Sequence, residues 1–184
     1  MQKDFEVVTV LRDCDAIVIP SGTAVTLPEH CRVVIIQELG GSFTVNENGR
    51  LLRIAEKDAD ALGKKATASA ALNRETGTSS EVDLSLVLDQ LKICYDPEIP
   101  VNIVDLGLIY TLDRRLLIDG RQMVSITMTL TAFGCGMGPV LVEDIREKVL
   151  CVPGVDLVDV RIVYDPPWSY DMMSDAAKLA LGLL

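Results

Sequence analysis

The first third of the chain alternates short, β-branched apolar runs with turn residues. Six such runs are predicted as strands, at residues 5–11, 16–19, 23–27, 31–37, 42–45 and 51–54. Glycine, proline and asparagine separate the runs, and the pair Asn48–Gly49 suits the positive φ angles of a tight hairpin turn. Residues 1–56 are therefore predicted to form a small all-β module, either a barrel or a sandwich.

Residues 57–82 differ in composition from the residues before them. Alanine, serine, threonine and charged residues replace the β-branched ones. A segment with so few side chains to bury is typical of a linker, and its alanines favour some helix. We therefore predict a partly helical linker at residues 57–82, followed by a second domain at residues 83–184.

The second domain shows helical and strand periodicities in turn. Leu84, Val87, Leu88 and Leu91 are spaced as one face of a helix, and Pro139 opens a second helix that extends to residue 149. Strands are predicted at 104–112, 123–130 and 158–162, and a last helix, capped by Asp171 or Ser174, extends to residue 181. The crossover between the last two strands makes them parallel. The predicted fold class is α+β (α-β-β-α-β-α): a small mixed β-sheet with helices packed on one face, preceded by the all-β module.

Composition and charge exclude several classes of function. Hydrophobic residues make up 49% of the 184 residues and aromatic residues only 4%, so the core must be mainly aliphatic. The net charge is −10 and both halves of the chain are acidic, so a phosphate backbone would be repelled and no nucleic-acid partner is expected. No apolar run approaches the roughly 18 residues that a membrane span needs, so no membrane partner is expected either.

Cysteine usage indicates a compartment. The five cysteines are odd in number and widely spaced, they include no C-x-x-C pair, and no secretory segment opens the chain. Free thiols are the rule in the reducing cytosol, so we expect a cytoplasmic protein. A closed zinc site cannot be argued from this spacing.

Cys135 is the strongest candidate for chemistry. It lies between a predicted strand and a predicted helix, and it is surrounded by Gly134, Gly136 and Gly138, which let the backbone approach a ligand closely. A helix N-terminus stabilises anions, so this placement favours a thiolate that can bind a metal or act as a nucleophile. Two alternatives stay open. The cysteine could be a small buried side chain in a tight turn, or the glycines could cradle a phosphate, although the loop contains no lysine.

Two further segments carry candidate residues. Glu98 and Asp105 are acids among apolar residues, and each must find a backbone donor, a metal or a general-base role. Trp168, the only tryptophan, follows a double proline after the last predicted strand. For all three residues a structural role is the commoner outcome, and for Trp168 the functional alternative is partner binding.

Three motifs resemble the metal–sulfur cluster assembly family. The residues from Asp96 to Tyr110 are similar to the opening of that family's domain, Met128–Pro139 to its cysteine loop, and Asp165–Ser174 to its C-terminal run. Together these motifs cover roughly residues 84–184. The β module and the Gly-Cys-Gly-Met-Gly form of the loop resemble one branch of the family in particular.

The resemblance implies a role in iron–sulfur protein maturation. Cys135 would be the essential thiol, transiently binding iron or an iron–sulfur cluster. Asp105 and Thr131 match polar positions of the same pocket, and Glu98 matches the acidic position of the opening motif. The implied partners are the iron–sulfur assembly machinery and client apo-proteins. Where the family pattern has a proline, this chain has Phe133, so a hydrophobic wall replaces a stiff entry to the loop.

Three functions remain to be distinguished. In the leading one, a maturation factor acts through Cys135; one thiolate cannot supply the four ligands of a cluster, so the cluster would be shared across a homodimer or with a client. In the second, a metal-free adaptor recruits clients through Trp168 and the β module. In the third, Cys135 is the nucleophile of a thiol enzyme, with Asp105 or Glu98 as its base. We expect the protein not to be an enzyme.

Overall fold

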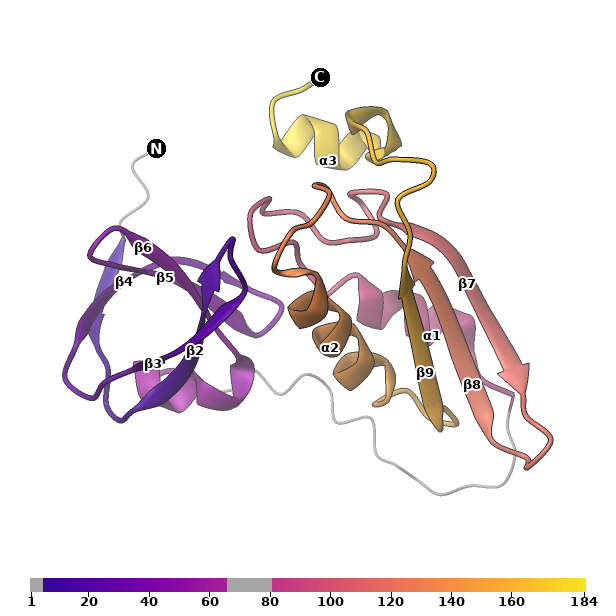
Figure 1. The fold of residues 1–184 in the computed structure, drawn as a ribbon, viewed down its shortest axis with the longest axis horizontal. Helices are drawn as coiled ribbons and strands as arrows, with labels where there is room; N and C mark the ends of the chain where they lie inside the picture. Colours follow the sequence, from indigo (N-terminus) through magenta and orange to yellow (C-terminus); the bar gives the residue numbers. More distant parts are fainter. Residues whose placement is uncertain (1–4, 66–80) are drawn as a thin grey trace. The chain divides into compact units, whose positions relative to one another are not determined.

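The computed structural model describes residues 5–65 and 81–184, which form two compact units (Figure 1). The first unit consists mainly of the N-terminal strands, and the second consists of α1 (Leu84–Leu91) and the helices and strands that follow it. None of the described helices combines the length and the apolar character that crossing a bilayer requires.

The first unit is one antiparallel sheet of six strands, ordered β1-β4-β5-β6-β2-β3, which confirms the all-β N-terminal region. The strands are β1 (Glu6–Thr9), β2 (Cys14–Ile19), β3 (Thr23–Leu27), β4 (Arg32–Leu39), β5 (Ser42–Glu47) and β6 (Arg50–Ile54). The sheet curls around an aliphatic core in which Phe43 is the largest fully buried side chain. Asn48 and Gly49 both have positive φ angles, of 50° and 90°, in the β5–β6 hairpin turn, as the sequence predicted.

A 3₁₀ helix, η1 (Glu56–Leu62), follows the sheet and packs into its core through Ala59, Ala61 and Leu62. The sequence pattern predicts these residues to be part of the linker. They pack on the sheet because the small or apolar side chains of Ala59, Ala61 and Leu62 are buried in its core. The rest of the predicted linker, residues 66–80, lies outside the described residues.

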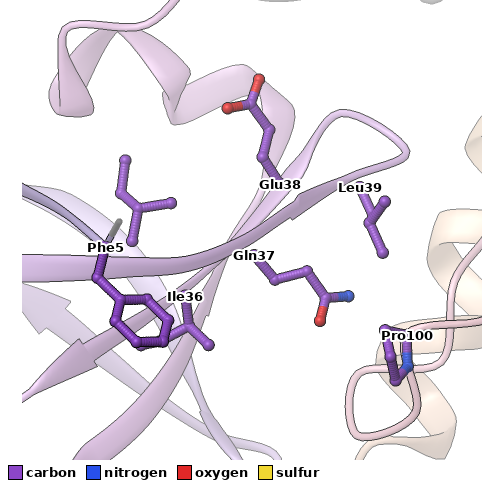
Figure 2. A pocket seen from close by; sticks show the side chains of 7 residues that line it. Phe5, Ile36, Gln37, Glu38, Leu39 and Pro100 are labelled. Atoms are coloured by element: carbon purple, nitrogen blue, oxygen red, sulfur yellow. The ribbon is translucent and has the colours of Figure 1, made fainter. Parts of the chain in front are cut away.

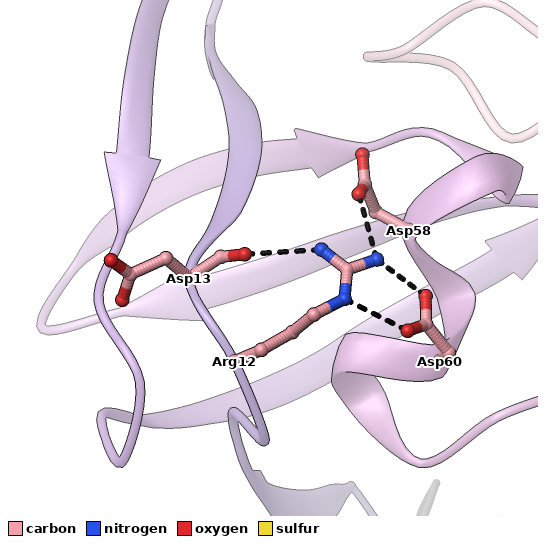
Figure 3. A network of polar contacts seen from close by, with 4 residues as sticks. All are labelled: Arg12, Asp13, Asp58 and Asp60. Carbon is pink, nitrogen blue, oxygen red and sulfur yellow. Dashed lines mark hydrogen bonds and ion pairs between the residues drawn. The ribbon is translucent and has the colours of Figure 1, made fainter.

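Arg12 ties η1 to the chain before β2 (Figure 3). Its Nη2 atom lies 3.0 Å from Asp58 Oδ1 and 2.6 Å from Asp60 Oδ1, and its Nε donates to Asp60 Oδ2 over 2.8 Å. Its Nη1 donates to the carbonyl of Asp13 over 3.0 Å. The guanidinium lowers the pKa of Asp60 through these hydrogen bonds. The charges of Arg12, Asp58 and Asp60 are thus paired with one another within the first unit.

A hollow lies beside β4. It is lined by Phe5, by residues 35–39 and by Pro100 (Figure 2). This lining contains neither cysteine nor histidine, so the metal-binding candidates of the sequence lie elsewhere.

The second unit has a sheet of three strands, ordered β7-β8-β9. Its elements after α1 are β7 (Ile109–Leu116), β8 (Gln122–Met128), α2 (Gly138–Val149), β9 (Leu157–Ile162), the 3₁₀ helix η2 (Tyr170–Met172) and α3 (Asp175–Ala180). Strands β7 and β8 are antiparallel, and β8 and β9 are parallel, as the crossover rule predicted. Helices α1 and α2 lie on one face of the sheet (Figure 1). The predicted α+β fold class is confirmed.

The predicted strand at 104–112 begins later than expected, at Ile109. Residues before it form a turn in which the Asn102 side chain accepts hydrogen bonds from the backbone N–H groups of Val104 and Asp105, over 3.1 and 2.9 Å. Gly107 ends this turn with a φ of 72°. The local hydrogen bonds of asparagine compete with the sheet ladder, and the apolar pattern does not reveal this.

Candidate functional site

The loop between β8 and α2 presents Cys135 at the start of α2. The N–H of Cys135 donates to the carbonyl of Ala132 over 3.4 Å, and Gly134 has a φ of 73°. An i to i+3 bond with a positive φ at the third residue is the signature of a type II turn. The N–H of Gly138 in turn donates to the carbonyl of Cys135 over 3.1 Å. Cys135 is a free, half-buried thiol, so a ligand from solvent can reach it.

The three glycines of this loop differ in the physical reason for which glycine is favoured at each position. A Cβ at Gly134 would meet nothing within 4 Å, so its positive φ alone favours glycine. A Cβ at Gly138 would lie 2.9 Å from Leu130 Cδ1 and 3.4 Å from Ile162 Cδ1. Gly138 therefore lets the first turn of α2 pack closely on the sheet, while Gly136 is exposed.

Phe133 precedes Gly134 in the turn and is 85% exposed. Its ring centroid lies 4.7 Å from that of Tyr164, with the two planes tilted by 57°. The sequence predicted a hydrophobic wall at this position. In the structure, Phe133 forms an aromatic pair with Tyr164, which lies shortly after the end of β9.

Asp105 is half-buried and bonded within its own turn. Its Oδ2 accepts a hydrogen bond from Asn102 Nδ2 over 2.6 Å, and its carbonyl accepts one from the N–H of Ser174 over 2.8 Å. One oxygen of this carboxylate therefore has a hydrogen-bond partner within the turn. Its second oxygen and its position in the 102–108 turn are the features that a pocket role would use.

Trp168 is half-buried, and its Nε1 donates to the carbonyl of Leu106 over 2.8 Å. The Tyr110 hydroxyl donates to the carbonyl of Pro166 over 2.6 Å. A Cβ at Gly107 would lie only 2.2 Å from the carbonyl oxygen of Met172, which shows how closely the two segments approach. Residues 166–174 are therefore held on the turn that contains Asp105. This supports the structural interpretation of Trp168, and its role in partner binding stays a prediction.

The remaining predicted pocket residues differ in exposure. Glu98 is exposed in the loop after α1, and Thr131 is half-buried at the entry to the cysteine loop. Thr129 was not among the predicted residues, and its fully buried hydroxyl has no hydrogen-bond partner among the described residues. The only sequence signal for it was its position at the end of an alternating strand.

A resident metal would need several ligands in one place. Within residues 5–65 and 81–184, no group of three or more histidine, cysteine, aspartate or glutamate side chains is arranged to hold a metal ion. Cys14 and Cys94 are buried, each in the core of its own unit. Cys31, Cys135 and Cys151 are free and half-buried, and among the described residues only Cys135 of these three lies in a glycine-rich loop. Any further ligands for a metal on Cys135 would have to come from elsewhere.

Comparison with known proteins identifies the class. Residues 85–162 match the family described as iron–sulfur cluster assembly protein. An "Fe-S protein maturation auxiliary factor" of Porphyromonas gingivalis is 45% identical over 98 residues, which are 53% of this chain and 90% of the relative. The chain belongs to the iron–sulfur cluster assembly protein family, as its motifs predicted.

Two further relatives refine this result. The maturation auxiliary factor YitW of Bacillus subtilis is 40% identical over 97 residues, covering 53% of this chain and 91% of YitW. The maturation auxiliary factor SufT of Staphylococcus aureus is 40% identical over 88 residues, covering 48% of this chain and 96% of SufT. SufT is the branch that the loop sequence resembled, and this similarity is confirmed. About half of this chain accounts for nearly all of each relative.

Proposed function

We propose that this protein is an accessory factor in the maturation of iron–sulfur proteins, acting through Cys135, which transiently binds iron or an iron–sulfur cluster. Relatives that match the second unit are maturation auxiliary factors by name, which supports the coarse role. The observation that carries the finer proposal is the half-buried free thiol of Cys135, held by a type II turn at the N-terminus of α2. The proposal assigns binding and transfer to this thiol, and no catalytic turnover.

The surroundings of Cys135 suit transient binding. A thiolate is the ligand form of cysteine, and the free, half-buried Cys135 thiol is accessible to a ligand from solvent. Cys135 supplies one thiolate, whereas a cluster takes four ligands, so a cluster on Cys135 must be shared. The other ligands would come from a second copy of the chain or from a client apo-protein, and such a cluster leaves easily. Asp105 and Thr131, which belong to the same unit as Cys135, are the residues proposed to line the approach.

The test is anaerobic reconstitution with iron and sulfide, in the reducing conditions of the proposed cytoplasmic site of action. Wild type, Cys135→Ser and Cys151→Ser are compared by visible absorption and by iron per chain. Cys151 is the matched control because it is also half-buried and free, and its Sγ donates to the carbonyl of Glu147 at the end of α2. We expect iron on wild type and on Cys151→Ser, and its loss from Cys135→Ser.

Two outcomes would contradict the carrier proposal. Equal iron on wild type and Cys135→Ser would mean that the thiol is not the ligand. No iron on any folded variant would favour the metal-free adaptor, which is then pursued by client capture with wild type and Trp168→Phe. Trp168→Phe keeps an aromatic ring while removing the hydrogen bond to Leu106.

A further inference from the structure

The turn that presents Cys135 lacks the residue that would stiffen it. In the turn from Ala132 to Cys135, Phe133 occupies the second position, where proline is favoured because its fixed φ matches the turn. Phenylalanine supplies no such restriction. The third position is Gly134, the residue with the largest conformational freedom. The backbone by itself therefore restrains this turn weakly.

The Phe133 side chain supplies a restraint of another kind. Its ring packs against Tyr164 at a centroid distance of 4.7 Å, in a tilted arrangement that aromatic pairs favour. Only about a seventh of the Phe133 surface is covered, since the residue is 85% exposed. The contact is consequently small in area and specific in geometry.

Tyr164 stands on a well-anchored backbone. On one side of it, the N–H of Val163 donates to the carbonyl of Met128 over 2.8 Å, which extends the β8–β9 pairing. On the other side, the Pro166 carbonyl accepts from the Tyr110 hydroxyl over 2.6 Å. A ring that leans on Tyr164 is therefore fixed to the sheet of the second unit, and through it so is the turn.

We propose that Phe133 is a positioning residue: its contact with Tyr164 holds the Ala132–Cys135 turn and so fixes the Cys135 thiol at the start of α2. The restraint comes from side-chain packing, where a proline would provide it through the backbone. This inference rests on the proposed function only in taking Cys135 as the acting thiol. The restraint itself is a property of the loop and is measurable without iron.

The experiment measures how fast the Cys135 thiol reacts with iodoacetamide at fixed pH, in the full-length, metal-free protein. Peptide mass spectrometry separates Cys135 from Cys151, which serves as the internal reference in every sample. The variants are Phe133→Ala, Tyr164→Ala, the double variant, Tyr164→Phe and Phe133→Pro. Amide hydrogen exchange of the peptide that spans residues 132–137 is recorded in parallel.

Loss of the contact should loosen the turn and expose the half-buried thiol. We expect Phe133→Ala and Tyr164→Ala each to raise the Cys135 rate by about two- to tenfold, the range that corresponds to one aromatic contact. The double variant should match the single ones, because both remove the same contact. Tyr164→Phe keeps a ring and Phe133→Pro restores a backbone restraint, so both should react at the wild-type rate. The Cys151 rate should be constant throughout.

Three results would overturn the proposal. The first is an unchanged Cys135 reaction rate together with unchanged amide hydrogen exchange in Phe133→Ala. If that variant nevertheless delivered clusters less well, Phe133 would be a client-docking residue. The second is additive effects in the double variant. The third is a rate in Phe133→Pro as high as in Phe133→Ala. In each case iron binding that depends on Cys135 can still hold, so the proposed function is tested separately.

Discussion

The two units use the same side chain in opposite ways. In the β unit, Cys14 begins β2 and is only 3% exposed, and burial together with the nearby Asp58 raises the pKa of its thiol to about 11. In the second unit, Cys135 is half-buried in a loop that opens onto a helix start. A neutral thiol in a core behaves as a small apolar side chain, whereas an accessible one can act as a ligand. Neighbouring residues decide the role, and the cysteine itself does not.

The units also differ in how they fasten irregular segments. The β unit holds η1 by charge, through Arg12 and two carboxylates. The second unit holds its C-terminal segment by close backbone approach at Gly107 and by single hydrogen bonds from Trp168 and Tyr110. A charged contact weakens when either partner changes its protonation state, whereas a close backbone approach is disrupted by the addition of a single methyl group. Each mode of attachment can therefore be broken by a different change.

The largest effect is expected from Gly107→Ala. Its added Cβ would lie 2.2 Å from the Met172 carbonyl oxygen, and alanine is also strained at a φ of 72°. Backbone atoms cannot move aside as a flexible side chain can, so we expect a loss of about 3 kcal/mol in the free energy of unfolding of the second unit. Urea denaturation, followed through the fluorescence of Trp168 on the same segment, measures it.

Gly120→Ala is the matched control for this change. Gly120 has a φ of 84°, and a Cβ there would meet nothing within 4 Å. It should therefore show the cost of the positive φ alone, about 1 kcal/mol. Equal losses of stability in the two variants would mean that the C-terminal segment moves away from Gly107 at no cost. The close approach of Met172 to Gly107 would then not hold that segment.

A smaller effect, dependent on pH, is expected from Cys14. The unfolded chain releases the thiol proton near the ordinary value of 9.0, while the folded protein keeps it until about 11. Between these values the unfolded state binds fewer protons, so stability falls as the pH rises through this window and is fully present below it. The loss should amount to on the order of 2 kcal/mol.

Guanidinium denaturation at pH 8 and pH 11 of wild type and Cys14→Ala isolates this contribution. Other groups titrate over the same range in both proteins, so only the difference between the two pH dependences counts. Cys14→Ala should lose less stability over this range than wild type. Parallel curves would show that the thiol is not held neutral by the core, which would remove the contrast with Cys135.

Much of the fold could be predicted because period and turn chemistry are local. The alternation of Val124, Ile126 and Met128 against threonine and serine fixed the central strand, and Asn48–Gly49 fixed a hairpin. The cysteine loop could be singled out because three glycines surround one cysteine at a strand–helix junction, although Gly134 and Gly138 also have conformational and packing reasons. Its role as a metal-binding loop stays a prediction. The parallel pairing of β8 and β9 followed from chain handedness.

What could not be predicted depends on contacts between segments far apart in the sequence. Nothing near Phe133 indicates Tyr164, and nothing near Trp168 indicates that its indole would bond the Leu106 carbonyl. Likewise the packing of η1 depends on Arg12, which precedes it by more than 40 residues. Charge, composition and spacing carry no information on such pairs, so the hydrogen bonds of Trp168 and Asp105 became visible only in the structure, and their functional roles stay predictions.

The smallest effect is expected at the charged fastening of the β unit. Arg12→Gln removes the guanidinium from Asp58, whose side chain is only 11% exposed and whose Oδ2 already has no hydrogen-bond partner among the described residues. A buried carboxylate left without its cation destabilises the fold, whereas removing both charges together is nearly neutral. We therefore expect Arg12→Gln to lower Tm by a few degrees and Arg12→Gln/Asp58→Asn to recover most of that loss.

Arg12→Gln/Asp60→Asn should recover little, because Asp60 is 64% exposed and water already solvates it. Differential scanning calorimetry of the three variants decides the point. Equal recovery by both double variants would mean that the network stabilises η1 through net charge alone, with no contribution from the buried Asp58.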